Sequence, residues 1–215
     1  EVSDSIRPGS TGSKSVRIYT RSVLGIIANG ILTTGQVNLG STTASDPKNH
    51  TRTRTAQPDF RQELSAKPDS IRFWYKFLCP NETQHARMIA VIHDNFDYMD
   101  PEAFDPAAPS HVVGKALCEF NRGDQKWHEA CVPFVYDVYP ASTPHYILLS
   151  FTTNRVPGSG SASDQLFIDD ISFVYNPLLS SIHIAGAPIP EFDPHIYDYY
   201  VAVRGDYTNA TVTVT

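Results

Sequence analysis

The alternation of side chains in residues 164–175, DQLFIDDISFVY, constrains the fold of this chain most. Successive side chains of a β-strand point to opposite faces, so this segment predicts a strand with apolar residues on both sides. Asp169 falls on the side of the larger residues, where a carboxylate is costly unless a cation or several hydrogen bonds meet it. We therefore expect a buried, partnered Asp169 in a strand whose faces carry Phe167, Ile171, Phe173 and Tyr175 on one side and Leu166 and Ile168 on the other.

The composition favours pleated sheet and makes some partners unexpected. Charged residues make up only 19% of the 215 residues, and the chain has 11 Tyr and 11 Phe, which is typical of β proteins rather than helical bundles. The 17 basic and 23 acidic residues give a net charge of −6 without a basic run, so nucleic acid is not an expected partner. No run of about 20 apolar residues is present. The chain also has neither an initiator Met nor a signal peptide, so any export signal is expected outside this sequence.

Short strand-like segments bounded by Gly, Pro, Asn and Asp, with no helical period between them, predict an all-β fold. We expect an antiparallel β-sandwich of jelly-roll type. Residues 1–14 are expected to form a loop, and the long connections 40–68 and 94–111 to be functional rims or mobile segments. The predicted strands cover residues 16–27, 70–77, 87–93, 112–120, 127–136, 146–152 and 166–175.

A domain boundary is expected at Asn176-Pro177. Residues 1–176 would form the sandwich. Residues 177–215 restart an alternating pattern at 182–184 and 199–203, but they are too few to form a sandwich unaided. They predict the opening strands of an immunoglobulin-like module that the chain cuts short.

The segment 70–77, SIRFWYKF, predicts an exposed aromatic platform. If its apolar residues Ile71, Phe73, Tyr75 and Phe77 enter the core, the opposite face presents an indole between two cations. Sugars have apolar C–H faces and hydroxyl edges, which suit an aromatic ring beside hydrogen-bond donors. The alternative is a packed surface Trp shielded by the stems of its two neighbours. The residues of this predicted platform are Arg72, Trp74 and Lys76.

Other candidate groups leave alternatives open. His93-Asp94, at the end of a predicted strand, could form an acid/base pair or a cation site, or only a hydrogen bond that anchors the loop. A hairpin around residues 123–125 would place Cys118 opposite Cys131, either bridged or as two thiols. Glycosidases need two carboxylates about 5 to 9.5 Å apart, and Glu119 and Glu129 are candidates that nothing in the sequence excludes.

Four segments resemble one known family. They are GSKSVRI at 12–18, KPDSIRFWYK at 67–76, VPFVY at 132–136 and LFIDDI at 166–171. Together they resemble the putative carbohydrate metabolism domain of exported proteins from gut bacteria, over most of residues 10–176. The resemblance implies a jelly roll similar to carbohydrate-binding modules and some glycoside hydrolases, joined to an immunoglobulin-like domain. In sandwiches of this kind the aspartate of the last strand often holds a structural calcium ion, here Asp169. Its partners often come from an aromatic-rich first strand, which is expected before residue 10 but is missing from this sequence.

The resemblance and the residues together predict glycan recognition without catalysis, by a cell-surface lipoprotein or a periplasmic protein. Arg72, Trp74 and Lys76 would bind the glycan with His93 and Asp94 at the rim, beside neighbouring outer-membrane polysaccharide-utilisation proteins. The alternatives are a glycoside hydrolase and a structural adhesin or spacer. Two close carboxylates on a concave face would favour the hydrolase. An aromatic shelf without such carboxylates would favour glycan binding, and a face fully covered by residues 94–111 would favour the spacer.

Overall fold

The computed structural model describes residues 1–23, 25–81, 83–121, 123–176, 179–193, 196, 198–200, 202 and 211–214. The chain divides into two compact units, Glu1–Val174 and Tyr175–Thr215. Within the described residues the regular structure consists of β-strands and three short 3₁₀ helices, η1 (Pro58–Phe60), η2 (Glu102–Phe104) and η3 (Ala108–His111). No helix in this part of the chain has the length and apolar character needed to cross a membrane.

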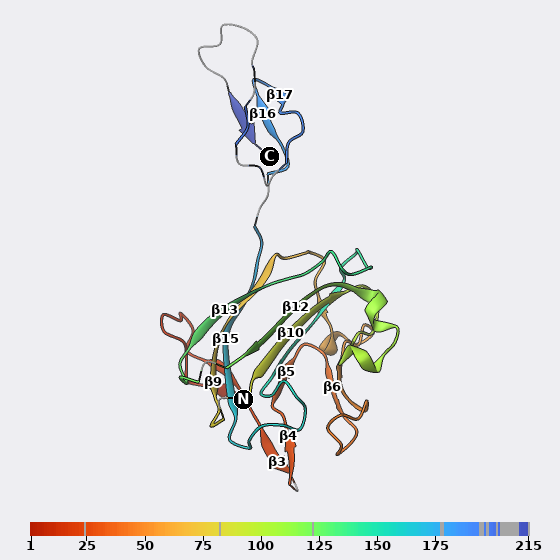
Figure 1. Ribbon diagram of the computed structural model, residues 1–215, viewed down its shortest axis with the longest axis vertical. Coiled ribbons are helices and arrows are strands. Elements are labelled where there is room, and N and C mark those ends of the chain that lie inside the picture. Colours follow the sequence, from red (N-terminus) through yellow and green to blue (C-terminus); the bar gives the residue numbers. More distant parts are fainter. Residues whose placement is uncertain are drawn as a thin grey trace. The chain divides into compact units, whose positions relative to one another are not determined.

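The first unit is an antiparallel β-sandwich with jelly-roll topology (Figure 1). If its eight main strands are numbered in chain order, one sheet has the order 1-8-3-6 and the other 5-4-7-2, which is the arrangement of a jelly roll. We call them the β9 sheet and the β10 sheet. The β9 sheet contains β1 (Val2–Ser3), β2 (Ser15–Tyr19), β15 (Gln165–Val174), β9 (Ser70–Leu78) and β13 (His128–Pro133); the β10 sheet contains β12 (Val112–Phe120), β10 (Ala86–His93), β14 (Tyr146–Thr152), β5 (Ile31–Thr33) and β8 (Gln62–Glu63).

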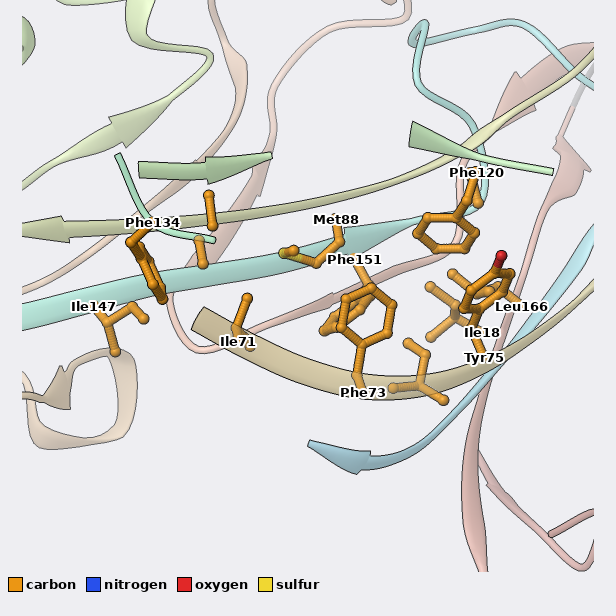
Figure 2. Packing of buried hydrophobic residues seen from close by; sticks show 14 of the residues in the cluster. Ile18, Ile71, Phe73, Tyr75, Met88, Phe120, Phe134, Ile147, Phe151 and Leu166 are labelled. Atoms are coloured by element: carbon orange, nitrogen blue, oxygen red, sulfur yellow. The ribbon is translucent and has the colours of Figure 1, made fainter. Parts of the chain in front are cut away.

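The core lies between the two sheets and confirms the predicted alternation of β9 (Figure 2). The rings of Phe73 from β9 and Phe151 from β14 meet edge to face, with centroids 5.0 Å apart. Each large apolar side chain buried in this way contributes about 1.5–3 kcal/mol to the free energy of unfolding. The side chains of β9 that are buried here are Ile71, Phe73, Tyr75 and Phe77.

A β-bulge interrupts the last strand, β15. Asp169 lies opposite Trp74 and Ser172 lies opposite Arg72, so β15 has one residue more than β9 over this stretch. The bulge coincides with a positive φ of 46° at Asp170. Asp is among the few residues that tolerate this left-handed conformation.

The bulge changes which side chains of β15 share a face. Before it, Phe167 and Asp169 point away from the core, whereas Leu166 and Ile168 are buried in the core. After it, Phe173 packs against the core and Ile171 is 41% exposed. The prediction that Phe167, Ile171 and Phe173 lie on one side is therefore wrong, because the extra residue reverses the alternation.

Residues 94–111 cover part of the other outward face of the sandwich. They contain β11 (Met99–Asp100) and two of the 3₁₀ helices, and β11 joins a small sheet with β7 (Asn49–Arg52) and β6 (Gln36–Leu39). Several outward-pointing side chains of the β10 sheet are buried under this segment, so the long connection is packed structure. The buried cluster consists of Ile89, Val91, Tyr98, Ala108, Val112 and Leu148.

The predicted pairing of two cysteines is wrong. Cys118 lies on β12 opposite Met88, in the β10 sheet, and Cys131 lies on β13 opposite Arg72, in the β9 sheet. Both are free thiols, and Cys131 is exposed. β12 and β13 follow each other in the chain but belong to opposite sheets, so they do not form the hairpin that would bring the thiols together.

The remaining strands are short. β3 (Arg21–Val23) and β4 (Ile26–Ala28) form a hairpin, so the predicted strand 16–27 is divided among three elements. The second unit holds a three-stranded antiparallel sheet of β16 (Ile182–Ile184), β17 (Ala187–Pro188) and β18 (Val212–Val214). The predicted strand at 199–203 lies partly outside the described residues, and the immunoglobulin-like character of this unit stays a prediction.

Candidate functional site

The outward face of the β9 sheet carries the predicted platform residues. Arg72, Trp74 and Lys76 alternate with the buried side chains of β9 and so point away from the core. Arg72 is exposed, whereas Trp74 and Lys76 are half-buried. The Arg72 guanidinium lies 3.7 Å from the carboxylate of Glu129 on the neighbouring strand β13.

A second aromatic group lies on the same face beside Lys76. The Lys76 ammonium is 4.4 Å from the ring centroid of Phe167 and 5.5 Å from that of Trp127, and the two rings meet nearly perpendicularly. Partial burial lowers the pKa of Lys76. Neither Trp127 nor Phe167 was predicted to lie on this face. Phe167 lies opposite Lys76 on the neighbouring strand, and this pairing would have placed Phe167 on the outward face. The register of β15 cannot be read from the sequence alone, however.

The N-terminal segment lies over part of this face. The Arg7 guanidinium is 5.1 Å from the ring centroid of Trp74, and Arg7 Nε donates to Asp170 Oδ2 at 2.5 Å. Lys76 Nζ donates to the hydroxyl of Ser5. We call residues 5–7 the strap. The strap thus contacts Trp74, the central ring of the predicted platform. Residues 5–7, predicted to be part of a loop, have a defined position on the outward face of the β9 sheet.

Asp169 lies under the strap and is only 8% exposed. Its Oδ2 accepts the backbone N–H of Arg7 at 3.3 Å, and its Oδ1 accepts that of Asp170 at 3.0 Å. The expected burial is found, and backbone N–H groups satisfy the carboxylate. The two N–H groups thus occupy the carboxylate oxygens of Asp169 that a calcium ion would have to bind. No group of three or more His, Cys, Asp or Glu side chains in the described part of the chain could hold a metal ion. The surroundings of Asp169 therefore do not fit the calcium ion that the resemblance implies.

His93 and Asp94 do not lie at the rim of the platform. His93 is fully buried at the end of β10, in the other sheet, where Thr53 Oγ1 is 2.9 Å from its Nε2 and the Tyr98 ring stacks on it. Burial lowers the pKa of His93 to about 4. The Asp94 carboxylate pairs with His111 Nδ1 at 2.9 Å. β9 and β10 follow each other in the chain but belong to opposite sheets, which is why the predicted grouping is wrong.

The acidic residues of 94–111 are engaged in structural pairs. The Asp100 carboxylate accepts two hydrogen bonds from Arg87 of β10, at 2.9 and 3.0 Å. Such pairs fasten the segment to the strands beneath it, and they occupy the oxygens that acid/base chemistry would need. The other pairs are Asp97 with Thr55 and Arg54, Glu102 with Lys115 and Tyr98, and Asp105 with Arg52.

The two glutamates proposed as a catalytic pair lie on different sheets. Glu119 is on β12 and pairs with Arg155 at 2.9 Å, whereas Glu129 is on β13 opposite Trp74. A different pair of carboxylates flanks that ring, because Asp169 also lies opposite Trp74, on the other side of β9. Strands are about 4.8 Å apart, so the backbones of these two residues are separated by roughly 10 Å.

Comparison with known proteins shows the fold. No protein-family model and no curated protein matches the chain. The chain is similar to a solved structure described as a putative glycoside hydrolase from Bacteroides thetaiotaomicron, with 16% identity and a TM-score of 0.59 over 80% of this chain and 56% of that one. It is also similar to one described as a putative glycoside hydrolase from Bacteroides vulgatus, with 15% identity and a TM-score of 0.55 over 79% of this chain and 76% of that one. The chain thus shares its fold with these two structures and spans little more than half of the first of them.

Proposed function

We propose that this protein recognises glycans without catalysis, through the outward face of the β9 sheet. The observation that carries the proposal is the half-buried indole of Trp74 on an open sheet face. Beside it on this face lie Arg72 and the carboxylate of Glu129. An aromatic ring takes the apolar face of a sugar, and the charged groups around it can pair with the hydroxyl edges.

Two further features support this proposal. Trp127 offers a second indole on the same face, with the Lys76 ammonium nearby, so a chain of several sugar units could contact both rings. The fold likeness to structures described as putative glycoside hydrolases agrees with a carbohydrate-related role. We further propose an exported protein at the cell surface or in the periplasm that works beside other polysaccharide-utilisation proteins.

Removal of the central ring tests the proposal. A glycan array identifies a ligand for the wild-type protein, and calorimetry then compares Trp74→Ala with it. Loss of a ring that anchors a half-open site should weaken binding by roughly ten- to a hundredfold, while the melting temperature changes little. Tyr139→Ala is the matched control, because this ring lies beside Lys115 of the β10 sheet and should leave affinity unchanged. Wild-type affinity in Trp74→Ala, or unfolding of that variant, would assign Trp74 to the structure alone.

The strap gives a second, opposite prediction. A sugar that stacks on Trp74 competes with the Arg7 guanidinium for the ring. A cation–π contact at an exposed site is worth about 0.5–1 kcal/mol, so Arg7→Ala should bind the same glycan about two- to fivefold more tightly. Arg21→Ala is the control, since that arginine stacks on Tyr19 instead. Weaker binding by Arg7→Ala would show that Arg7 contacts the glycan rather than competes with it.

Glycoside hydrolysis is a second candidate function, favoured by the two carboxylates that flank Trp74. In that case reducing ends would be released from the glycan found on the array, and Glu129→Gln would stop the release while retaining binding. A spacer is favoured by the covered outward face of the β10 sheet. That role would leave the wild-type array without a ligand.

A further inference from the structure

Lys76 is a half-buried cation on the outward face of the β9 sheet that has no carboxylate partner. Its ammonium forms no ion pair with any of the described residues. Three arginines of the same face, Arg7, Arg17 and Arg72, each have a carboxylate at 2.5 to 3.7 Å. Burial lowers the pKa of Lys76, and no neighbouring carboxylate offsets this shift. A partly desolvated charge without a counter-ion favours an anion supplied from outside.

Two aromatic rings and one hydroxyl group lie beside this ammonium. It is 4.4 Å from the ring centroid of Phe167 and 5.5 Å from that of Trp127, and it donates one hydrogen bond to Ser5 Oγ. An ammonium has three N–H donors, so two of them have no oxygen acceptor in the described part of the chain. Ser5 Oγ accepts from Lys76, which leaves its own hydrogen free to donate. The two side chains together can therefore hold an oxygen anion.

Lys76 is also within reach of a sugar that stacks on Trp74. The two residues are two positions apart on β9 and share its outward face, so their Cα atoms are about 6.6 Å apart. Trp127 is near the same ammonium. When the Arg7 side chain leaves the indole to a sugar, its backbone N–H can stay bonded to Asp169, so the strap keeps its position. An acidic group on a sugar at either indole thus lies close to one cation.

The negative net charge of the chain does not oppose an anionic ligand at this place. Glu129 pairs with Arg72, and the oxygens of Asp169 accept backbone N–H groups. Charges farther away than about 8 Å are largely screened at physiological ionic strength. Five acidic residues lie in the segment 94–111 over the other sheet, namely Asp94, Asp97, Asp100, Glu102 and Asp105.

We propose that the glycan bound on this face contains acidic sugar units, whose carboxylate or sulfate group binds the Lys76 ammonium and the Ser5 hydroxyl. This inference rests on the proposed glycan recognition and names the class of glycan. The indole of Trp74 takes the apolar face of any sugar, so it does not distinguish acidic from neutral units. Hydrogen bonds between ionised groups are roughly twice as strong as neutral ones, so Lys76 makes that distinction.

Affinity electrophoresis of the full chain in defined polysaccharides tests this specificity. Polygalacturonate and alginate supply carboxylates, carrageenan supplies sulfates, and galactan and xylan are the neutral probes. The wild type should bind a carboxylated or a sulfated polymer about tenfold more tightly than either neutral one. A rise from about 50 to about 500 mM NaCl should weaken only the binding of the acidic polymer.

Lys76→Met removes the charge but keeps an unbranched apolar chain beside the rings. It should lose about tenfold in affinity for the acidic polymer, with the neutral polymers unaffected. Lys48→Met is the matched control, because it removes the same charge from the exposed connection between β6 and β7 and should leave affinity unchanged. If Lys76→Met does not fold, Ser5→Ala removes the second donor and should weaken acidic binding about two- to fivefold.

The outcomes separate this inference from the proposed function. A wild type that binds neutral polymers as tightly as acidic ones, or an acidic polymer bound equally by the wild type and the folded variants, overturns the role of Lys76 and leaves glycan recognition standing. Binding of no polymer in the set, together with a neutral ligand on the glycan array, has the same meaning. An array without any ligand overturns the proposed function and this inference together.

Discussion

At the residue scale, His93 makes the free energy of unfolding of the sandwich depend on pH. It is fully buried, with its ring between Thr53 and Tyr98, and burial lowers its pKa to about 4 from the ordinary 6.5. Between these two values the unfolded chain takes up a proton that the folded protein excludes. The free energy of unfolding therefore falls as the pH is lowered through this window and changes no further from this group below it.

Replacement of this histidine should remove that dependence. Between pH 6.5 and pH 4.5 the wild type should lose about 2–3 kcal/mol through His93, since one pKa unit corresponds to about 1.4 kcal/mol. His93→Gln should flatten the curve measured by denaturant titration. His128→Gln should leave it unchanged, because that histidine pairs with Asp124 near the surface. A wild-type curve that is flat across this range would contradict the buried, neutral state.

Single residues were predictable where the alternation of β9 decided them. The apolar side chains of β9 alternate with polar ones, so Phe73 was predicted to enter the core and Trp74 to lie on the outward face, as the structure shows. Arg7 was missed because nothing in a Ser- and Gly-rich segment indicates that it lies over a ring on another strand. The donors that satisfy Asp169 come from the same long-range contact, so the sequence left a choice between a cation and N–H groups.

At the scale of elements, the segment 94–111 depends on its anchor to β10. The Arg87–Asp100 pair is bidentate and largely buried. Loss of one partner of a buried pair leaves an uncompensated charge and costs about 3–5 kcal/mol. Asp100→Asn should therefore lower stability by about that amount and speed hydrogen exchange in residues 94–111.

An exposed pair provides the control for that anchor. Glu119→Gln breaks the pair with Arg155 on the same sheet face, which is half-exposed and should cost less than about 1 kcal/mol. Equal effects of the two substitutions would mean that the buried pair does not hold the segment in place.

Three errors at this scale come from the register and the topology of the strands. The bulge at Asp170 is a one-residue change of register, and period-2 patterns do not reveal where such a residue is inserted. The grouping of His93 with Trp74 and the pairing of Cys118 with Cys131 both assumed that consecutive strands are neighbours. In a jelly roll many consecutive strands belong to different sheets.

At the scale of the whole molecule, the sandwich should fold without the second unit. The first unit ends at Val174, and its core lies wholly within it. A chain of residues 1–176 should melt within about 2 °C of the main transition of the full chain and bind glycan equally, because no residue of the sandwich core is removed. Aggregation or a large loss of stability would show that residues 177–215 complete the fold.

The order of strands also determines when folding can occur. β15, the last strand of the sandwich to be synthesised, lies between β2, near the start of the chain, and β9. Until about residue 174 has been synthesised, β2 has no partner on that side and the edge of β9 stays unpaired. Such a high contact order makes folding slow and leaves apolar strands exposed meanwhile. The β9 sheet therefore cannot close until residue 174 has been synthesised, and its earlier strands lack their central partner until then.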